Sequence, residues 1–165
     1  MYAFTADPAL PKPELYRELT ASALALVAGE PDPVANMANV AALIWQLVPR
    51  LNWAGFYRVA KNDGGAGELV LGPFQGKPAC IRIALGQGVC GTAAASGETQ
   101  RVADVHAFPG HITCDSESRS ELVVPVLHGG AVIAVIDLDS PEPARFDADD
   151  AAGIEALARA IAPYV

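Results

Sequence analysis

Three cysteines are the first residues in this sequence that could do chemistry: Cys80, Cys90 and Cys114. A thiolate is a nucleophile and a redox group, whereas a buried thiol behaves as a small apolar side chain. Cys90 has a valine and a glycine as neighbours, and a place in the core would explain it as well as chemistry does. Cys114 follows a threonine and precedes an aspartate in a polar stretch. That setting favours chemistry over burial as a core residue.

A zinc site is a second interpretation of the same cysteines, with His106 and His111 as further ligands. The His-x4-His spacing is compatible with a metal site. However, no two cysteines are separated by two to four residues, and closed zinc sites usually contain such a pair. We therefore expect no bound metal.

The glycines around Cys90 have the spacing of a dinucleotide-binding turn, Gly86-x-Gly88-x-x-Gly91. Such a turn needs a full crossover helix of about a dozen residues before the next parallel strand. Between Gly91 and Gly97 the sequence offers only TAAAS, and an antiparallel hairpin is predicted further on. We therefore interpret the glycines as a tight turn that lets a short helix pack closely on a sheet, and keep nucleotide binding as a minor alternative.

Carboxylates are concentrated at the end of an apolar strand, AVIAVIDLD. Strand alternation places Asp137 and Asp139 on one face, and Glu121 opens the partner strand of the same predicted hairpin. Two buried acids side by side are unfavourable unless they bind something, although a solvated strand end is the alternative. Trp53 and Tyr57 share a face of another strand, where ordinary core packing explains them equally well.

Hydrophobic periodicity, together with capping and turn residues, predicts the helices and strands that must position these residues. Helical spacing covers residues 14–29 and 33–48, and Asp32 and Pro33 form the start of the second helix. A last helix covers 147–162, with acids in its first turn. Strands are predicted over 51–60, 68–74, 79–85, 100–105, 121–127 and 131–139. Helices at both ends of a mostly antiparallel sheet indicate an α+β domain. Residues 106–120 form a long polar loop, a feature that is usually functional.

Length and composition predict one compact domain over residues 1–165 with a substantial core, since 52% of residues are hydrophobic. The net charge of −8 and the lack of a Lys/Arg cluster argue against nucleic-acid partners. No apolar run reaches the roughly 18 residues that span a bilayer, and the N-terminal segment does not resemble a secretory signal. We therefore expect a cytoplasmic protein without membrane contact, whose thiols are not structural disulfides.

Five stretches together carry a family resemblance: NWAGFY, GPFQGKPACIRI, GQGVCGTA, VHAFPGHITCDSESRSELVVPV and VIDLDS. In this order they resemble the free methionine-(R)-sulfoxide reductase family, whose members are single GAF domains. The match runs from about Trp45 to Phe146, and the trio of cysteines makes it specific. One departure is the loop from Lys61 to Glu68, which is longer and richer in glycine.

The resemblance implies a six-stranded antiparallel sheet with the terminal helices on one side and a loop-covered pocket on the other. It also implies reduction of free L-methionine-(R)-sulfoxide without a cofactor, thioredoxin as the reductant, and a homodimer. By the matching motifs, Cys114 is the nucleophile, Cys80 the resolving thiol and Cys90 an auxiliary thiol.

The resemblance also matches three acids and two aromatic residues to the family's pocket: Glu121, Asp137, Asp139, Trp53 and Tyr57. Chemically, we expect Glu121 or Asp139 to donate a proton, because clustered acids have raised pKa values. We expect Asp137 to bind the substrate ammonium group, and the aromatic residues to enclose its methyl-sulfur end. The alternative function is a non-catalytic GAF domain that senses a small ligand or redox state.

Overall fold

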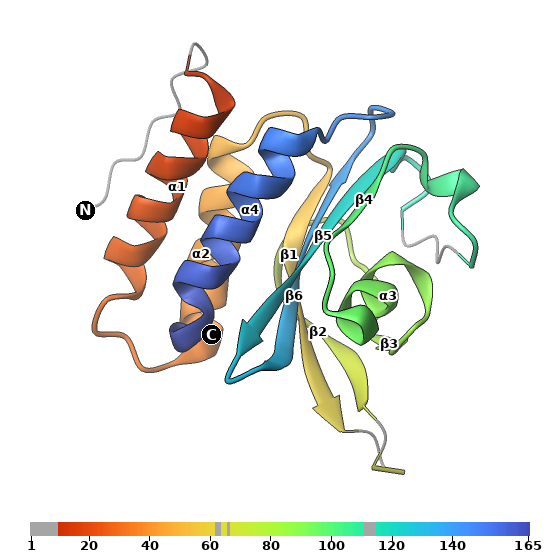
Figure 1. Cartoon of the computed structure of the whole chain (residues 1–165), viewed down its shortest axis with the longest axis horizontal. Helices are drawn as coiled ribbons and strands as arrows, with labels where there is room; N and C mark the ends of the chain where they lie inside the picture. The colour runs from red at the N-terminus through yellow and green to blue at the C-terminus, as the bar shows by residue number, and fades with distance from the viewer. Residues whose placement is uncertain (1–9, 62–63, 66, 111–114) are drawn as a thin grey trace.

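The computed structural model describes residues 10–61, 64–65, 67–110 and 115–165. In this part of the chain six strands form one antiparallel sheet, in the order β3-β2-β1-β6-β5-β4. Helices α2 and α4 cover one face, α1 packs on the outer side of these two helices, and α3 packs on the other face (Figure 1). The strands are β1 Trp53–Lys61, β2 Gly67–Gly76, β3 Arg82–Ala84, β4 Gln100–Val102, β5 Ser120–His128 and β6 Ala131–Ser140. The helices are α1 Lys12–Val27, α2 Pro33–Leu47, α3 Gly88–Ser96 and α4 Ala148–Ile161, with 3-10 turns η1 Val105–Ala107 and η2 Ala162–Tyr164. The predicted α+β fold is confirmed.

Local signals place the long helices. The Asp32 side chain accepts hydrogen bonds from the N–H groups of Val34 and Ala35, which caps α2. At α4, Asp147 and Asp150 form a reciprocal capping box. Each such cap stabilises a helix by roughly 1 kcal/mol. Both helix starts were predicted from sequence, because capping depends only on residues within one turn.

Strand alternation divides the sheet into two packed faces. Phe56, Leu122 and Ile136 face the helical layer next to the sheet, α2 and α4, in the larger core cluster. Tyr57 and Val123, their neighbours along β1 and β5, face α3 in a second cluster. Since each fully buried large apolar side chain contributes roughly 1.5–3 kcal/mol, the larger cluster is the main source of stability. The acids of β5 and β6 lie on the same face as the second cluster, where they line a pocket together with residues of α3.

The position of helix α3 shows that the spaced glycines do not form a dinucleotide-binding turn. Its connections run from β3 at one edge of the sheet to β4 at the other, so they form no parallel crossover unit. A Cβ at Gly91 would lie 2.4 Å from the Ala84 carbonyl oxygen, which is why only glycine fits there. The helix begins at Gly88 and is longer than the TAAAS segment suggested. The glycines thus allow close packing, as predicted.

Two predicted strands are shorter in the structure. β3 contains only Arg82–Ala84, so residues 79–81 of the predicted strand run outside the ladder. β4 ends at Val102, and residues 105–107 form the turn η1. The β5–β6 hairpin is confirmed: Gly129 and Gly130 both have positive φ in its turn, the backbone that a two-residue hairpin turn needs. No helix in the described ranges is long and apolar enough to span a bilayer.

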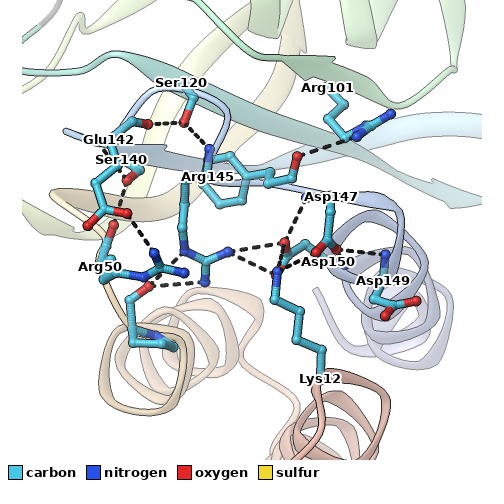
Figure 2. Close-up of polar contacts among 12 residues, drawn as sticks. Lys12, Arg50, Arg101, Ser120, Ser140, Glu142, Arg145, Asp147, Asp149 and Asp150 are labelled. Carbon is cyan, nitrogen blue, oxygen red and sulfur yellow. Dashed lines mark hydrogen bonds and ion pairs between the residues drawn. The ribbon is translucent and has the colours of Figure 1, made fainter.

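A buried ion pair joins the helical layer to the end of the sheet (Figure 2). The Arg145 Nη1 donates to both carboxylate oxygens of Asp150 at 3.1 Å. Lys12 and Tyr16 of α1 also donate to Asp150, at 2.6 and 2.7 Å. The backbone N–H of Arg145 donates to the Ser120 hydroxyl at 3.3 Å. The network therefore connects α1 and α4 to the first residue of β5, next to the acid-bearing end of the strand.

Candidate active site

Three carboxylates meet on the α3 face of the sheet. In the β5–β6 register Glu121 lies opposite Asp139, and Val123 lies opposite Asp137. Because side chains alternate along strands, the three acids share one face. Glu121 and Asp137 are each only 6% exposed. The predicted convergence of the acids is therefore present in the structure, and they line a pocket under α3.

Cys90 covers these acids from α3. Its Sγ lies 3.9 Å from Glu121 Oε1, and the thiol is buried. The donor atoms of Cys90, Glu121 and Asp137 all lie within 4.8 Å of one another. By spacing alone this set could hold a metal ion, and its carboxylates suit an ammonium group equally well. His106 is exposed on η1 and is not among the residues that line the pocket, so the described part of the zinc set suggested by the sequence is not assembled.

Burial raises the pKa values of the clustered acids, so that they keep their protons to higher pH than exposed acids do. It raises the pKa of Glu121 and of Asp139 well above the ordinary carboxyl value, and the charge of Asp137 raises both pKa values further. Burial raises the pKa of Asp137 to about 7, although hydrogen bonds from Cys90 and Glu121 act in the opposite direction. Burial and the charge of Asp137 also raise the pKa of the Cys90 thiol. The cluster therefore still holds protons at neutral pH that exposed acids would have lost.

One oxygen of the cluster has an unfilled hydrogen-bonding position. Asp137 Oδ1 is buried and accepts no hydrogen bond from any residue that the structure describes. A buried carboxylate oxygen without a donor is unfavourable by a few kcal/mol, because it has lost its water. Lys77 is a cation near the rim of this pocket, and its Nζ is occupied by Asp115 and Glu117. The arrangement is suited to a guest that brings its own positive charge.

Aromatic side chains lie beside the acids on the same face of the sheet, because β1 pairs with β6 and Trp53 is the register partner of Asp139. Trp53 and Tyr57 both line the pocket from β1, and their ring centroids are 5.8 Å apart. Phe74 also stacks on Trp53, with ring centroids 5.2 Å apart. Trp53 Nε1 donates to the Lys77 carbonyl, and the Tyr57 hydroxyl donates to the Cys80 carbonyl. The predicted shared face is confirmed, and the two side chains also anchor the backbone near Cys80.

Two loop segments flank the mouth of the pocket. We call residues 77–81 the Cys80 arm and residues 115–119 the Asp115 arm. The Cys80 arm connects β2 to β3, and Cys80 is half-buried and disulfide-bonded. The Asp115 arm is held by Asn52, whose Nδ2 donates to Asp115 Oδ2 at 3.2 Å and to Ser118 Oγ at 3.0 Å. The predicted nucleophile Cys114 and the candidate zinc ligand His111 lie outside the described residues.

Comparison with known proteins identifies the family. A model of the GAF domain matches residues 32–164. The free methionine-R-sulfoxide reductase of Escherichia coli is 46% identical over 88% of this chain and 86% of its own length. The Saccharomyces cerevisiae protein of the same name is 44% identical over 92% of this chain and 86% of its own length. The solved structure of free methionine-R-sulfoxide reductase from Neisseria meningitidis in complex with its substrate has a TM-score of 0.91 and 45% identity, and the match covers 99% of this chain and 95% of the other.

The chain belongs to the free methionine-R-sulfoxide reductase family of GAF domains. The resemblance drawn from the sequence motifs is confirmed. The roles of Cys114, Cys80 and Cys90 within this reductase family member stay predictions, as do those of the individual acids.

Helix α3 adds a feature to the family member's site that the sequence did not predict. Its N-terminal residues Gln87, Gly88 and Val89 line the pocket, and the helix has no side-chain cap. Within the described ranges, the N–H groups of Gly88 and Val89 donate to no backbone carbonyl. Unpaired N–H groups and the helix dipole together favour an anion at this end. The pocket thus contains both backbone donors, at the start of α3, and an open carboxylate oxygen, on β6.

Sequence reasoning also missed the side chains that hold the pocket rim, namely Asn52, Lys77, Asp115, Glu117 and Ser118. Two signals for them were available. Lys77 belongs to the same motif as Cys80, and Asp115 directly follows Cys114 in the polar loop. What the sequence did not indicate is that these two segments, about 40 residues apart, are joined.

Proposed function

We propose that the protein reduces free L-methionine-(R)-sulfoxide to L-methionine. The observation that carries the proposal is the open, buried oxygen of Asp137 within a cluster of three acids and a thiol. The ammonium group of a free amino acid supplies the missing cation. The family membership supports the same substrate, because the relatives from Escherichia coli and Saccharomyces cerevisiae are named free methionine-R-sulfoxide reductases.

The first chemical step transfers oxygen from the substrate to Cys114. The thiolate attacks the sulfoxide sulfur, and Glu121 or Asp139 protonates the sulfoxide oxygen. The sulfur–oxygen bond of the substrate breaks, and the oxygen ends on Cys114 as a sulfenic acid, while methionine is released. The raised pKa values of both acids support the donor role, since a donor must keep its proton at neutral pH.

The second step resolves the sulfenic acid. The Cys80 thiol attacks the sulfenic sulfur of Cys114, a sulfur–sulfur bond forms, and the oxygen leaves as water. Thioredoxin then reduces the disulfide by thiol exchange, which a reducing cytoplasm supports. Two features support Cys80 over Cys90 as the main partner. Cys80 is disulfide-bonded in the structure, and burial raises the pKa of the Cys90 thiol, which disfavours its reactive thiolate form.

The substrate's two charges orient it in the pocket. The ammonium group binds Asp137 Oδ1, and the carboxylate accepts from the N–H groups of Gly88 and Val89 at the start of α3. The methyl-sulfur end then lies against Trp53 and Tyr57. A peptide-bound or N-acetylated sulfoxide has no ammonium group and leaves the Asp137 oxygen unpaired.

The test compares kcat/KM for free and N-acetylated methionine-(R)-sulfoxide. We expect the free amino acid to be preferred by several orders of magnitude, as for other sites that leave a buried polar group unpaired with the wrong substrate. Asp137→Asn should reduce the preference mainly by weakening the reaction of the free amino acid. Similar kcat/KM values for the two substrates would overturn the ammonium-binding role. A thiol titration separates the reductase from a sensor, because only a reductase loses thiols in stoichiometric response to the sulfoxide.

A further inference from the structure

Lys77 forms an electrostatic connection between the two arms at the mouth of the pocket. Its Nζ lies 3.3 Å from the carboxylate oxygens of Asp115 and also contacts Glu117. Lys77 belongs to the Cys80 arm, whereas Asp115 and Glu117 belong to the Asp115 arm. The two hydrogen bonds join residues separated by 38 and 40 positions in the chain.

Each arm is otherwise fastened to the body of the protein. The Cys80 arm is held by Trp53 Nε1 at the Lys77 carbonyl, by the Tyr57 hydroxyl at the Cys80 carbonyl, and by the Leu71 N–H at the Ile81 carbonyl. In the Asp115 arm, the Arg119 N–H donates to the carbonyl of Ser140. These contacts set where each arm leaves the sheet. The Lys77 contacts act between the arms themselves.

The arms matter because each is adjacent to a cysteine of the proposed reaction. Cys80 lies three residues after Lys77, and Cys114 directly precedes Asp115, with consecutive Cα atoms about 3.8 Å apart. A disulfide forms only when the two Cα atoms come within about 4.4–6.8 Å. The structure shows the Lys77 contacts with Cys80 already disulfide-bonded. If the same contacts form in the enzyme before the disulfide closes, they raise the effective concentration of one sulfur at the other, as any tether does.

We propose that Lys77 is a positioning residue for the resolving step: by bridging Asp115 and Glu117 it holds the Cys80 arm against the arm of the oxidised nucleophile. The inference rests on the proposed function. The step that it promotes is the attack of the Cys80 thiol on the Cys114 sulfenic sulfur. The sulfur–sulfur bond forms, the sulfur–oxygen bond breaks, and the thiol proton leaves with the hydroxyl group as water. One thiol sulfur is oxidised and the sulfenic sulfur is reduced, so no outside oxidant is needed.

Lys77 is exposed, and its contacts with Asp115 and Glu117 are of the kind that salt screens. Exposed ion pairs have small effects, so we expect the bridge to change the rate of disulfide formation by roughly two- to fivefold. The bridge leaves the chemistry of oxygen transfer to the residues on the pocket floor. An experiment can therefore measure the two steps separately, as the rate of methionine formation and the rate of disulfide formation.

The experiment mixes fully reduced enzyme with one equivalent of free methionine-(R)-sulfoxide in low salt. Quenched samples give three quantities: methionine formed, disulfide formed, and Cys114 sulfenic acid trapped by dimedone. We expect Lys77→Gln to form one methionine per subunit, as the wild type does, but to form the disulfide roughly two- to fivefold more slowly and to give more dimedone adduct. Lys77→Arg should restore the rate. Arg159→Gln, which removes a surface cation paired with Glu155 on α4, should behave as the wild type.

Two further measurements distinguish a bridge between the loops from a simple effect of the Lys77 charge on the thiols. Glu117→Gln keeps the lysine cation but removes one of its partners, so a bridge predicts slower disulfide formation in this variant as well. Salt at about 1 M, where charges are screened within about 3 Å, should slow the wild type to the rate of Lys77→Gln and leave that variant unchanged.

The inference is overturned if Lys77→Gln forms the disulfide at the wild-type rate, if Glu117→Gln has no effect, or if salt slows both enzymes equally. In each of these cases methionine still forms, so the proposed function survives. Absence of methionine formation by the wild type would refute the proposed function, and this inference with it.

Discussion

Glu121 on β5 lies directly opposite Asp139 on β6, and the two carboxyl groups share the α3 face of the sheet with Asp137. Opposed residues on antiparallel strands have Cβ atoms about 4.5–5.5 Å apart, close enough for two charges to repel each other strongly. Burial strengthens this effect, and the pKa values of both groups are raised. An acid pair of this kind holds protons that exposed carboxyl groups would have lost.

The first prediction concerns the pH dependence of the reaction. A proton donor with a raised pKa is active while it is protonated, so kcat/KM should fall as the pH rises through that pKa. We expect Glu121→Gln or Asp139→Asn, whichever removes the donor, to lower kcat/KM by roughly 10²–10⁴-fold and to abolish the alkaline decline. Profiles measured between about pH 5 and pH 9 would assign the donor. An unchanged alkaline decline in both variants would contradict the proposal.

The second prediction concerns stability. The pKa of Asp137 is raised to about 7 in the folded protein, above its ordinary value of 3.8. Its contribution to stability is therefore complete below the ordinary value and is lost as the pH rises towards 7. The asparagine of Asp137→Asn does not ionise, so this variant should be more stable than the wild type at pH 8, by roughly 4 kcal/mol, and about equally stable at pH 4. Urea unfolding of both proteins at the two pH values, in the same redox state, measures the difference. If the variant is less stable than the wild type at pH 8, the folded protein does not disfavour the ionised form of Asp137, and the prediction is wrong.

The third prediction separates the cysteines. Cys114→Ser should abolish methionine formation. With both proteins fully reduced, it should leave the thermal unfolding midpoint close to that of the wild type, because the predicted nucleophile belongs to a polar loop sequence. Detectable turnover by this variant would remove Cys114 from the mechanism.

The fourth prediction concerns the resolving thiol. Cys80→Ser should form one methionine per subunit and then recycle poorly with thioredoxin, with Cys90 giving partial rescue. Steady-state turnover and the single-turnover burst, measured on the same preparation, distinguish the two phases. Normal cycling by Cys80→Ser would transfer the resolving role to Cys90.

The fifth prediction tests the buried ion pair of Figure 2. Asp150 is fully buried and receives hydrogen bonds from Arg145, Lys12 and Tyr16. Asp150→Asn leaves the buried guanidinium of Arg145 without its counter-charge, and we expect a loss of about 3–5 kcal/mol in the free energy of unfolding. The neighbouring Asp149 is exposed in the first turn of the same helix, so Asp149→Asn is the matched control and should cost less than about 1 kcal/mol. Equal effects in the two variants would contradict the structural role of the pair.

Several features of the fold were predictable because they depend on neighbours in the chain. The caps at Asp32 and Asp147 act within one helical turn, and Gly129 and Gly130 specify a tight hairpin turn by their own backbone freedom. The shared face of Asp137 and Asp139 follows from the two-residue period of a strand. The family motifs added the candidate cysteines, although Cys114 itself lies outside the described residues.

The tertiary structure decided what depends on residues distant in sequence. That Asp137 Oδ1 is buried without a donor follows from how β6 is covered by α3, and no local pattern reports this. The start of α3 at Gly88 brings Gln87, Gly88 and Val89 to the lining of the pocket, although glycine is a weak helix former. The bridge from Lys77 to Asp115 and Glu117 exists only because the strand order brings two distant loops to one rim. Sequence periodicity determines which face a side chain takes, whereas the order of strands in the sheet determines what that side chain meets.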